Sequence, residues 1–248
     1  AFHTLMIFDA GSFTAMPPSV QMEVLQEVIR YPAIKRVVVE SRAPLVSREI
    51  LSPLVRILGD KRLTVRVGVE TQDDRLRLNV LRKGLSRTQL ETATEVMRSL
   101  SITSGGYALL NPAPGLDPAW AMNEAVETLE WILNPEGLGM DEAYFGPACV
   151  SPNTTLATFW ERGEYQPSSL SAVLDVLERA LPKYQGRVHL LRFEDEPPFV
   201  AVPSNHTPHG IPQSLEGAEG CDIEFHRMFD AYRESMNPQT LHQIECHH

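Results

Sequence analysis

Short runs of apolar residues alternate with longer amphipathic stretches along most of the chain. The runs have the length and the Val, Ile and Leu content of strands that are covered on both faces. They predict six strands, at residues 5–8, 36–40, 63–70, 104–110, 141–145 and 187–193. The alternation of such strands with helical patterns is typical of an α/β fold with parallel strands.

The stretches between the strands carry apolar residues at intervals of three and four, which is the period of an amphipathic helix. Most of them also have a helix start or stop signal. In chain order these signals are Pro17-Pro18 at a start, Ser47 at a start with Gly59 at the stop, Ser86 and Asp117-Pro118 at starts, and Pro182 at a stop. Six strand–helix units favour a partial (β/α)6 barrel, similar to a TIM barrel, over an open doubly wound sheet.

The character of the chain changes after residue 195, where Pro-rich and His-rich segments replace the regular alternation. We therefore predict a barrel over residues 1–195 and an irregular C-terminal appendage over 196–248 that packs on it, with a last helix near 223–235. Neither the G-x-G-x-x-G pattern nor the P-loop pattern follows any predicted strand. The sequence thus gives little support to a dinucleotide or P-loop site.

The net charge of the chain bears on whether its partner is a nucleic acid. The chain of 248 residues has 22 Lys and Arg against 32 Asp and Glu, which gives a net charge of −10. This charge does not support nucleic acid binding through an extended positively charged surface. The densest cationic stretch is Arg75, Arg77, Arg82, Lys83 and Arg87. Its ordinary interpretation is a solvated helix face, and it is also the one place where a nucleic acid substrate would dock.

The chain has the features of a cytoplasmic protein. It contains no apolar run of the length of a membrane span, and its first residues lack the charged region and cleavage site of a signal peptide. Its three cysteines, Cys149, Cys221 and Cys246, are an odd number at wide spacing. That pattern predicts reduced thiols rather than a disulfide framework.

Polar residues follow several of the predicted strands, at the end where ligands bind in parallel α/β barrels. They are Gly11-Ser12-Phe13, Glu40-Ser41-Arg42, Glu70 and Asn111. A carboxylate at the end of an apolar strand needs a positive partner. That partner is either a protein cation, with Arg42, Arg66 and Arg82 as candidates, or a ligand group such as an ammonium. A buried ion pair at the barrel mouth and a ligand site both remain open at this point.

The ordered series of residues 7–13, 38–42, 67–71, 82–84 and 159–165 resembles the radical S-adenosylmethionine superfamily. Within it, the chain is similar to the Elp3-like branch, which includes the radical subunit of archaeosine synthase. The resemblance spans residues 5 to about 193. It implies a partial (β/α)6 barrel in which a [4Fe–4S] cluster, held by three cysteines, binds and reductively cleaves S-adenosylmethionine. The resulting 5′-deoxyadenosyl radical then abstracts hydrogen from a substrate.

The resemblance also implies roles for individual residues. Gly11-Ser12-Phe13 would meet the methionine amino group, Glu40 would lie near the methionine moiety, Glu70 would face the ribose, and Arg82 would bind the methionine carboxylate. The charges agree, because an amino acid zwitterion needs an anion and a cation, which Glu40 and Arg82 supply. The predicted cofactor-binding set is completed by Ser41, Arg66 and Asn111.

The chain departs from the family at the cluster. The family's C-x3-C-x2-C motif is absent, and the nearest cysteine, Cys149, stands alone. We therefore expect the first strand and the cluster loop to lie upstream of Ala1. The resemblance further implies an electron donor such as flavodoxin or ferredoxin, and a substrate that is a nucleoside, a modified base or another small molecule.

A second candidate site lies in the appendage. Cys221, Cys246, His206 and His209 are of the residue types that bind zinc or iron, and they predict a second metal site or an auxiliary cluster. The alternatives are solvated or capping histidines and, for His247-His248, the remnant of an expression tag.

Three functions follow from these patterns. The first is a radical S-adenosylmethionine enzyme. The second is a barrel without redox activity that acts as a binding or partner subunit. The third is a metal-dependent hydrolase or lyase that uses the C-terminal histidines, with Glu40 or Glu70 as general base.

Overall fold

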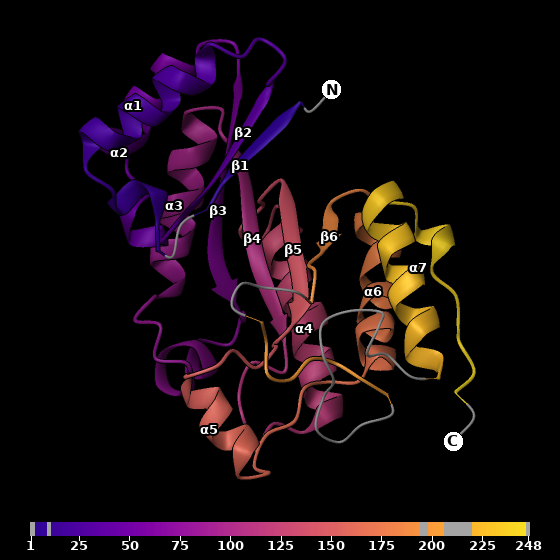
Figure 1. The fold of residues 1–248 in the computed structure, drawn as a ribbon. Coiled ribbons are helices and arrows are strands. Elements are labelled where there is room, and N and C mark those ends of the chain that lie inside the picture. Colours follow the sequence, from indigo (N-terminus) through magenta and orange to yellow (C-terminus); the bar gives the residue numbers. More distant parts are fainter. Residues whose placement is uncertain (1–2, 9–10, 194–197, 206–219, 247–248) are drawn as a thin grey trace. The chain divides into compact units, whose positions relative to one another are not determined.

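The computed structural model of the chain describes residues 3–8, 11–193, 198–205 and 220–246. Its strands are β1 (Thr4–Ile7), β2 (Arg36–Ser41), β3 (Arg62–Glu70), β4 (Thr103–Leu110), β5 (Glu142–Pro147) and β6 (Val188–Leu190). They form one six-stranded sheet in the order β1-β2-β3-β4-β5-β6 (Figure 1). The strands are parallel, and with their flanking helices they make an α/β partial TIM-like barrel, as predicted.

Most of the helices follow the strands as the apolar periodicity predicts, whereas no range was predicted for the helix over Thr155–Glu161. They are α1 (Pro18–Ile29), α2 (Arg48–Leu58), α3 (Arg87–Ser99), α4 (Pro118–Leu133), α5 (Thr155–Glu161), α6 (Leu170–Tyr184) and α7 (Cys221–Ser235). Ser47 caps α2 by accepting a hydrogen bond from the amide of Ile50, and Ser86 forms a capping box with Gln89. Gly59 ends α2 with a φ of 62°. These signals were therefore read correctly from the sequence.

Pro182 does not stop α6, which continues to Tyr184. Proline removes one helical hydrogen bond and crowds the preceding turn, so it normally ends or kinks a helix. Here Leu181 and Tyr184 on either side of it are buried. The prediction of a stop at Pro182 was wrong because burial of this last turn outweighs the local cost of the proline.

Short helical turns complete the fold: η1 (Phe13–Ala15), η2 (Ala43–Leu45), the π-helical η3 (Leu76–Val80) and η5 (Pro238–Thr240). The chain divides into two compact units. Unit 1 comprises residues 1–69, 82–107 and 131–143, and unit 2 comprises 70–81, 108–130 and 144–248. The predicted division into 1–195 and 196–248 stays a prediction.

Within unit 1, α1, α2 and α3 lie along one side of β1–β3 (Figure 1). In β2 and β3 every second residue is a fully buried apolar one, as with Val37, Val39, Val65 and Val67. The register pairs Glu40 with Arg66, and the alternate positions of the two strands carry charged side chains together with the fully buried Val38 and Thr64. The sequence predicted strands covered on both faces, and the new finding is that one of the two covered faces also holds charged side chains.

Within unit 2, α7 is fastened to β6 by hydrogen bonds from its last turns. The hydroxyl of Tyr232 donates to the carbonyl of Val188 at 2.7 Å, and the guanidinium of Arg233 donates to the carbonyl of Leu191 at 2.7 Å. Burial raises the pKa of Tyr232, so its phenol keeps the proton that makes this bond. These bonds hold α7 against β6 and the residue that follows it, and the packing of the whole segment 196–248 on the barrel stays a prediction.

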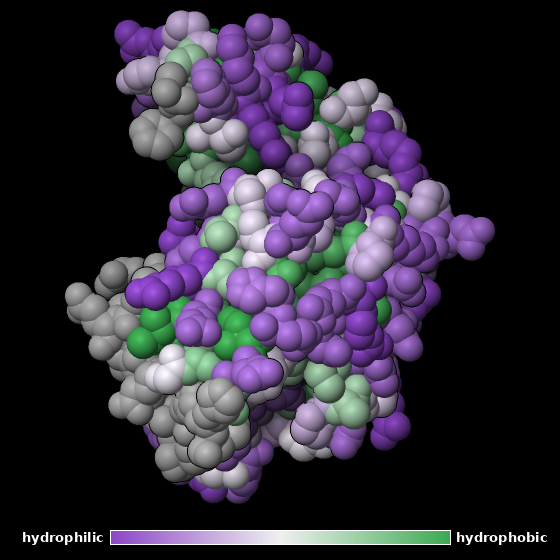
Figure 2. Space-filling model, turned by 90° about the vertical axis from the view of Figure 1, so that its right-hand side faces the viewer, coloured by the Kyte–Doolittle hydropathy of each residue, from purple (hydrophilic) through white to green (hydrophobic). Residues whose placement is uncertain are grey.

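The face of the molecule in Figure 2 is mainly hydrophilic, with hydrophobic residues gathered in smaller areas among the polar ones. This agrees with the composition, in which 22% of the residues are charged. Among the described residues, no helix combines the length and the apolar character that a membrane crossing requires.

Candidate functional site

The polar face of β2 and β3 in unit 1 carries two layers of charged side chains. In the layer near the start of the strands, Arg36 donates to the hydroxyl of Thr64 at 2.8 Å and to the carboxylate of Glu142 at 2.5 Å. The side chains of this ion pair are only 22% and 16% exposed. The charges of Arg36 and Glu142 therefore compensate each other in this layer.

The second layer lies nearer the strand ends and is built from three strands. The hydroxyl of Tyr107 donates to the carboxylate of Glu40, and Arg66 donates to the same hydroxyl at 3.4 Å. The guanidinium of Arg66 also lies 5.7 Å from the ring centre of Phe8. Burial, together with the hydrogen bond to Glu40, raises the pKa of Tyr107. The phenol therefore stays a donor, and it holds an anion and a cation side by side.

A network of buried hydroxyls fixes the segment after β1 against the end of β2. Each hydroxyl has one proton to donate. Ser41 donates its proton to the carbonyl of Arg42 at 3.1 Å, so in the 2.6 Å contact between Ser41 and Thr14 the donor is Thr14. Because the proton of Thr14 is then used, Ser12 is the donor in its 2.9 Å contact with Thr14, and the oxygen of Ser12 accepts from the amide of Arg42 at 3.2 Å. Every hydroxyl proton is used inside the network. Ser12 and Ser41 thus position the strand ends, and their direct contact with a ligand stays a prediction.

The remaining predicted residues of unit 1 differ in exposure. Phe13 is buried in the core, whereas Gly11 and Arg82 are exposed. A Cβ atom added to Gly11 would meet no heavy atom within 4 Å, so the backbone there borders open space. Arg82 has a φ of 51°, a conformation that few residues other than glycine adopt.

The turn after β3 belongs to unit 2 and is organised by a buried carboxylate. Glu70 has a φ of 66°, a strained conformation for this residue. The next residues are held by Glu124, which accepts hydrogen bonds from the hydroxyl of Thr71, the amide of Gln72 at 3.1 Å and the hydroxyl of Thr128 at 2.9 Å. Glu124 is only 5% exposed. These bonds keep Glu70 in its unusual conformation at the strand end.

Arg77 supports the same turn from the other side. Its guanidinium donates to the carbonyl of Thr71 at 2.5 Å and to the carboxylate of Asp74, and the residue has no solvent exposure. The sequence analysis placed Arg77 on a solvated cationic face, and for this residue the prediction was wrong. The π-helical η3 turns it into the interior, where the carbonyl and the carboxylate compensate its charge.

Asn111 follows β4 and has a φ of 55°. Its side-chain amide donates to the carbonyl of Gln166 at 3.0 Å, and the hydroxyl of Tyr165 lies within hydrogen-bond distance of the carbonyls of Asn111 and Ala148. Burial raises the pKa of Tyr165, with a smaller contribution from Cys149, so its phenol stays protonated. The turn after β4 is thus joined to the segment between α5 and α6.

These two segments enclose a pocket of about 490 Å³ that lies entirely within unit 2. Its lining is Asn111, Ala113, Gly115, Leu116, Pro118, Met122, Glu164, Tyr165, Gln166, Pro167, Ser168, Ser169 and Ala172. Of these, only Asn111 was predicted from the sequence to bind a ligand, whereas Glu164 and Tyr165 belong to the series 159–165 that carries the resemblance. Whether Asn111 and Glu70 face the same ligand as Gly11, Glu40 and Arg82 stays a prediction.

The chemistry of the pocket favours a ligand that is neutral or positively charged. Among the described residues that line it, Glu164 is the charged one. At its edge, one amide of each helix start is already used, because Trp120 of α4 donates to the carboxylate of Asp117 and Ala172 of α6 donates to the hydroxyl of Ser169.

The appendage cysteines form a disulfide, Cys221–Cys246, so the prediction of reduced thiols was wrong for this pair. Tertiary packing brings together two residues that are 25 positions apart. His206 and His209 lie outside the described residues, and within the described part of the chain no group of three or more potential metal ligands occurs. The predicted second metal site is therefore not tested.

No family model matches the chain. It is 23% identical over 243 residues to archaeosine synthase subunit beta of Methanosarcina acetivorans, covering 97% of this chain but only 65% of that protein. It is 25% identical over 244 residues to archaeosine synthase subunit beta of Thermococcus kodakarensis, covering 96% of this chain and 72% of that protein.

Among solved structures, the chain resembles the archaeal Elp3 of Methanocaldococcus infernus with an N-terminal deletion. The TM-score is 0.67 at 17% identity, and the match covers 96% of this chain and 55% of that one. At this identity the match establishes a shared fold.

Proposed function

We propose that this chain, which belongs to the Elp3-like and archaeosine synthase branch of the radical S-adenosylmethionine superfamily, provides the S-adenosylmethionine-binding barrel of a radical enzyme. The observation that carries the proposal is the layer of Glu40, Tyr107 and Arg66 in unit 1. Glu40 is the next-to-last residue of β2, whereas Arg66 and Tyr107 lie further back in β3 and β4, so the layer places a carboxylate near the end of the barrel where ligands bind and a guanidinium behind it.

The residues of unit 1 suit the methionine end of this cofactor. An α-amino acid zwitterion needs an acceptor for its ammonium and a donor for its carboxylate. Glu40 is the acceptor in the proposal, and Tyr107 fixes the orientation of its carboxylate. Arg82 and Arg66 are the candidate donors. The open space beside the backbone of Gly11 leaves room for a ligand atom at the end of β1.

Bound S-adenosylmethionine would supply the adenosyl group for hydrogen abstraction. The work of this chain is to bind and orient it. Glu70 is placed in the proposal against a ribose hydroxyl, and the hydrogen bonds of Glu124 and Arg77 fix the backbone turn that carries it. The strained φ of 66° at Glu70 supports a binding role, since such strain gathers at functional sites.

The chain's own cysteines do not fit an iron–sulfur cluster of the family's kind. Cys221 and Cys246 are paired in a disulfide, which leaves only Cys149 as a thiol. In the proposal, any cluster ligands come from outside residues 1–248. Two of the relatives are named subunit beta, which supports the proposal of a partner subunit. The proposed electron donor is a flavodoxin or a ferredoxin.

The pocket of unit 2 is the proposed place for the substrate. Glu164, the charged residue among the described lining, favours a small neutral or cationic molecule with N–H donors, a class that includes nucleosides and modified bases. The net charge of −10 does not favour a long nucleic acid as the partner.

Substitution of the charged residues tests the binding site directly. We expect Glu40→Ala and Arg82→Ala each to weaken S-adenosylmethionine binding by about 10- to 150-fold, which corresponds to about 1.5–3 kcal/mol for a lost charge-assisted contact. Isothermal titration of the full-length gene product would measure this. The control is Glu91→Ala on the exposed side of α3, which should bind as the unaltered protein does.

Unchanged binding in both variants would remove the site assignment. Iron and sulfide analysis of the anaerobically purified full-length protein, with an assay for reductive cleavage of S-adenosylmethionine, addresses the reaction itself. Cluster iron with cleavage supports the proposal. Binding without iron or cleavage would instead indicate a partner subunit without redox activity.

A further inference from the structure

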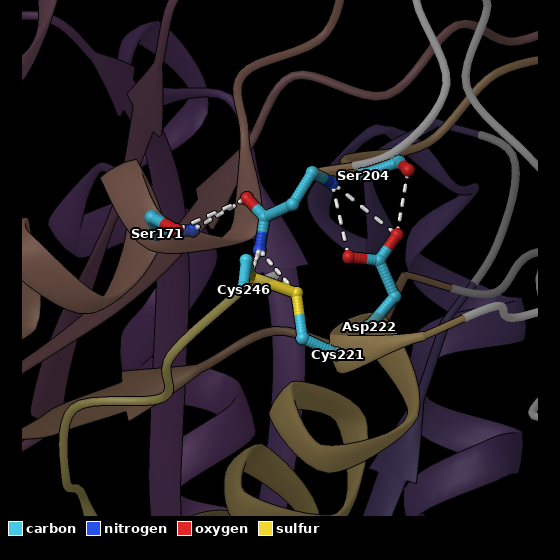
Figure 3. Close-up of a disulfide and its surroundings, with 6 residues drawn as sticks. Ser171, Ser204, Cys221, Asp222 and Cys246 are labelled. Carbon is cyan, nitrogen blue, oxygen red and sulfur yellow. Dashed lines mark hydrogen bonds between the residues drawn. A yellow bond between two sulfur atoms is a disulfide. The ribbon is translucent and has the colours of Figure 1, made fainter. Parts of the chain in front are cut away.

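The disulfide between Cys221 and Cys246 is set in a compact polar network in unit 2 (Figure 3). Cys221 is the first residue of α7, and Cys246 lies in the segment that follows η5. Asn205 directs its side-chain amide toward both sulfurs, at 3.8 Å from Cys221 Sγ and 3.6 Å from Cys246 Sγ. A neutral donor thus accompanies the disulfide whichever sulfur becomes negative.

The two cysteines differ in accessibility. Cys221 is only 8% exposed, whereas Cys246 is half-buried. A thiol reagent from solvent therefore reaches Cys246 Sγ more readily. Attack on that sulfur makes Cys221 the leaving group.

Cys221 is well placed to leave as a thiolate. It sits in the first turn of α7, where the peptide dipoles favour negative charge, and the N-cap residue Gly220 has no side chain to occupy the free amides. The acidic residues Asp222 and Glu224 in the same turn act in the opposite direction. The carboxylate of Asp222 is compensated by donors, accepting from the hydroxyl of Ser204 at 2.6 Å and from the amide of Asn205 at 3.0 Å.

We propose that Cys221–Cys246 is a redox-active disulfide and the site of thiol–disulfide exchange with a dithiol reductant. One thiolate of the reductant attacks Cys246 Sγ, forms a mixed disulfide and releases Cys221 as a thiolate. The second thiolate then attacks the reductant sulfur of the mixed disulfide and releases Cys246. The reductant leaves as its own disulfide, two electrons pass to the protein, and each cysteine takes up a proton. A disulfide oxidant reverses the sequence.

The disulfide is connected to the wall of the unit 2 pocket through Asn205. The side-chain oxygen of Asn205 accepts hydrogen bonds from the amide of Ser171 at 3.2 Å and from its hydroxyl at 3.1 Å. Ser171 lies in the first turn of α6, between the pocket-lining residues Ser169 and Ala172. Reduction releases Cys246 and removes one anchor of Asn205, so the start of α6 becomes more mobile when the pair is reduced.

The test begins with the full chain purified in air, whose disulfide content is measured by mass spectrometry without reduction. Glutathione, a monothiol, is then added, and the position of the mixed disulfide is mapped on peptides. We expect glutathione on Cys246 and not on Cys221. We expect dithiothreitol to reduce the pair completely, and hydrogen exchange at residues 170–173 to become several-fold faster after reduction.

Two variants separate the role of Asn205 from that of the surrounding surface. Asn205→Ala should slow the exchange with glutathione several-fold, because the departing thiolate loses its amide donor. Gln243→Ala, which removes a contact between the same C-terminal segment and Glu178 of α6, is the matched control and should react at the normal rate.

Three outcomes would overturn the proposal. One is the absence of the disulfide from protein purified in air. Another is glutathione on Cys221 or equally on both cysteines. The third is bound zinc that protects both cysteines from alkylation until a chelator removes it, which would make the pair a metal site. Unchanged exchange at residues 170–173 after reduction would refute the connection to the pocket. None of these results bears on S-adenosylmethionine binding by unit 1.

Discussion

Glu124→Ala is expected to lower the free energy of unfolding by about 3–4 kcal/mol. The carboxylate of Glu124 is the common acceptor for the hydroxyls of Thr71 and Thr128 and for the amide of Gln72. Alanine removes the acceptor of the Thr71 and Thr128 hydroxyls, whereas the amide of Gln72 still donates to the hydroxyl oxygen of Thr128 at 2.9 Å. Each unsatisfied buried donor costs about 1–3 kcal/mol, so the losses accumulate around this one side chain. Urea denaturation followed by circular dichroism measures the effect.

Glu127→Ala is the control for this experiment. Glu127 lies one turn further along α4, is exposed, and accepts a 3.3 Å hydrogen bond from the side chain of Gln72. Its loss should change the stability by less than about 0.5 kcal/mol. Glu124→Gln keeps one acceptor oxygen and should fall between the two. Equal stability of Glu124→Ala and Glu127→Ala would contradict a supporting role for the buried carboxylate.

Arg77→Met is expected to destabilise the protein by about 2–3 kcal/mol. The methionine side chain fills much of the volume of the arginine side chain but cannot donate a hydrogen bond. The carbonyl of Thr71 therefore loses the bond from the guanidinium of Arg77. Asp74 is half-exposed and is solvated after the substitution, so the loss arises mainly at the carbonyl. The midpoint of thermal or urea unfolding measures this change.

The matched control is Arg75→Met. Arg75 belongs to the same cationic stretch, two positions earlier, but it is exposed. Its replacement should leave the stability within about 0.5 kcal/mol of the original. If both variants were equally stable, Arg77 would belong to the solvated surface that its sequence context suggests, and the turn that carries Glu70 would have to be held by Glu124 alone.

The fold was readable from the sequence because its signals are local. Apolar runs and helical periodicity identified the strands and most of the helices, and Ser47, Gly59 and Ser86 marked helix ends that the structure confirms. A cap or a periodic face is decided by residues within a few positions of each other. Pro182 is the exception, where burial of the last turn of α6 overrides the local signal.

The candidate site was readable only in part. The residue types at the strand ends, among them Gly11, Glu40 and Glu70, stand next to strands that the pattern locates. The partner of Glu40 did not follow from the pattern. Tyr107 lies 67 positions away and meets Glu40 only because β2, β3 and β4 are neighbours in the sheet. Contacts between side chains on different strands depend on register, which a single sequence does not specify.

The sequence by itself determined the α/β barrel class, the order of its elements and which residues end the strands, because backbone periodicity and turn chemistry act over short distances. Only the tertiary structure decided which charges are compensated. It turned Arg77 inward, placed Glu124 under the turn after β3 and joined Cys221 to Cys246. Each of these depends on burial and on partners distant in sequence, and a side chain's charge, hydrogen bonds and reactivity are set by those surroundings.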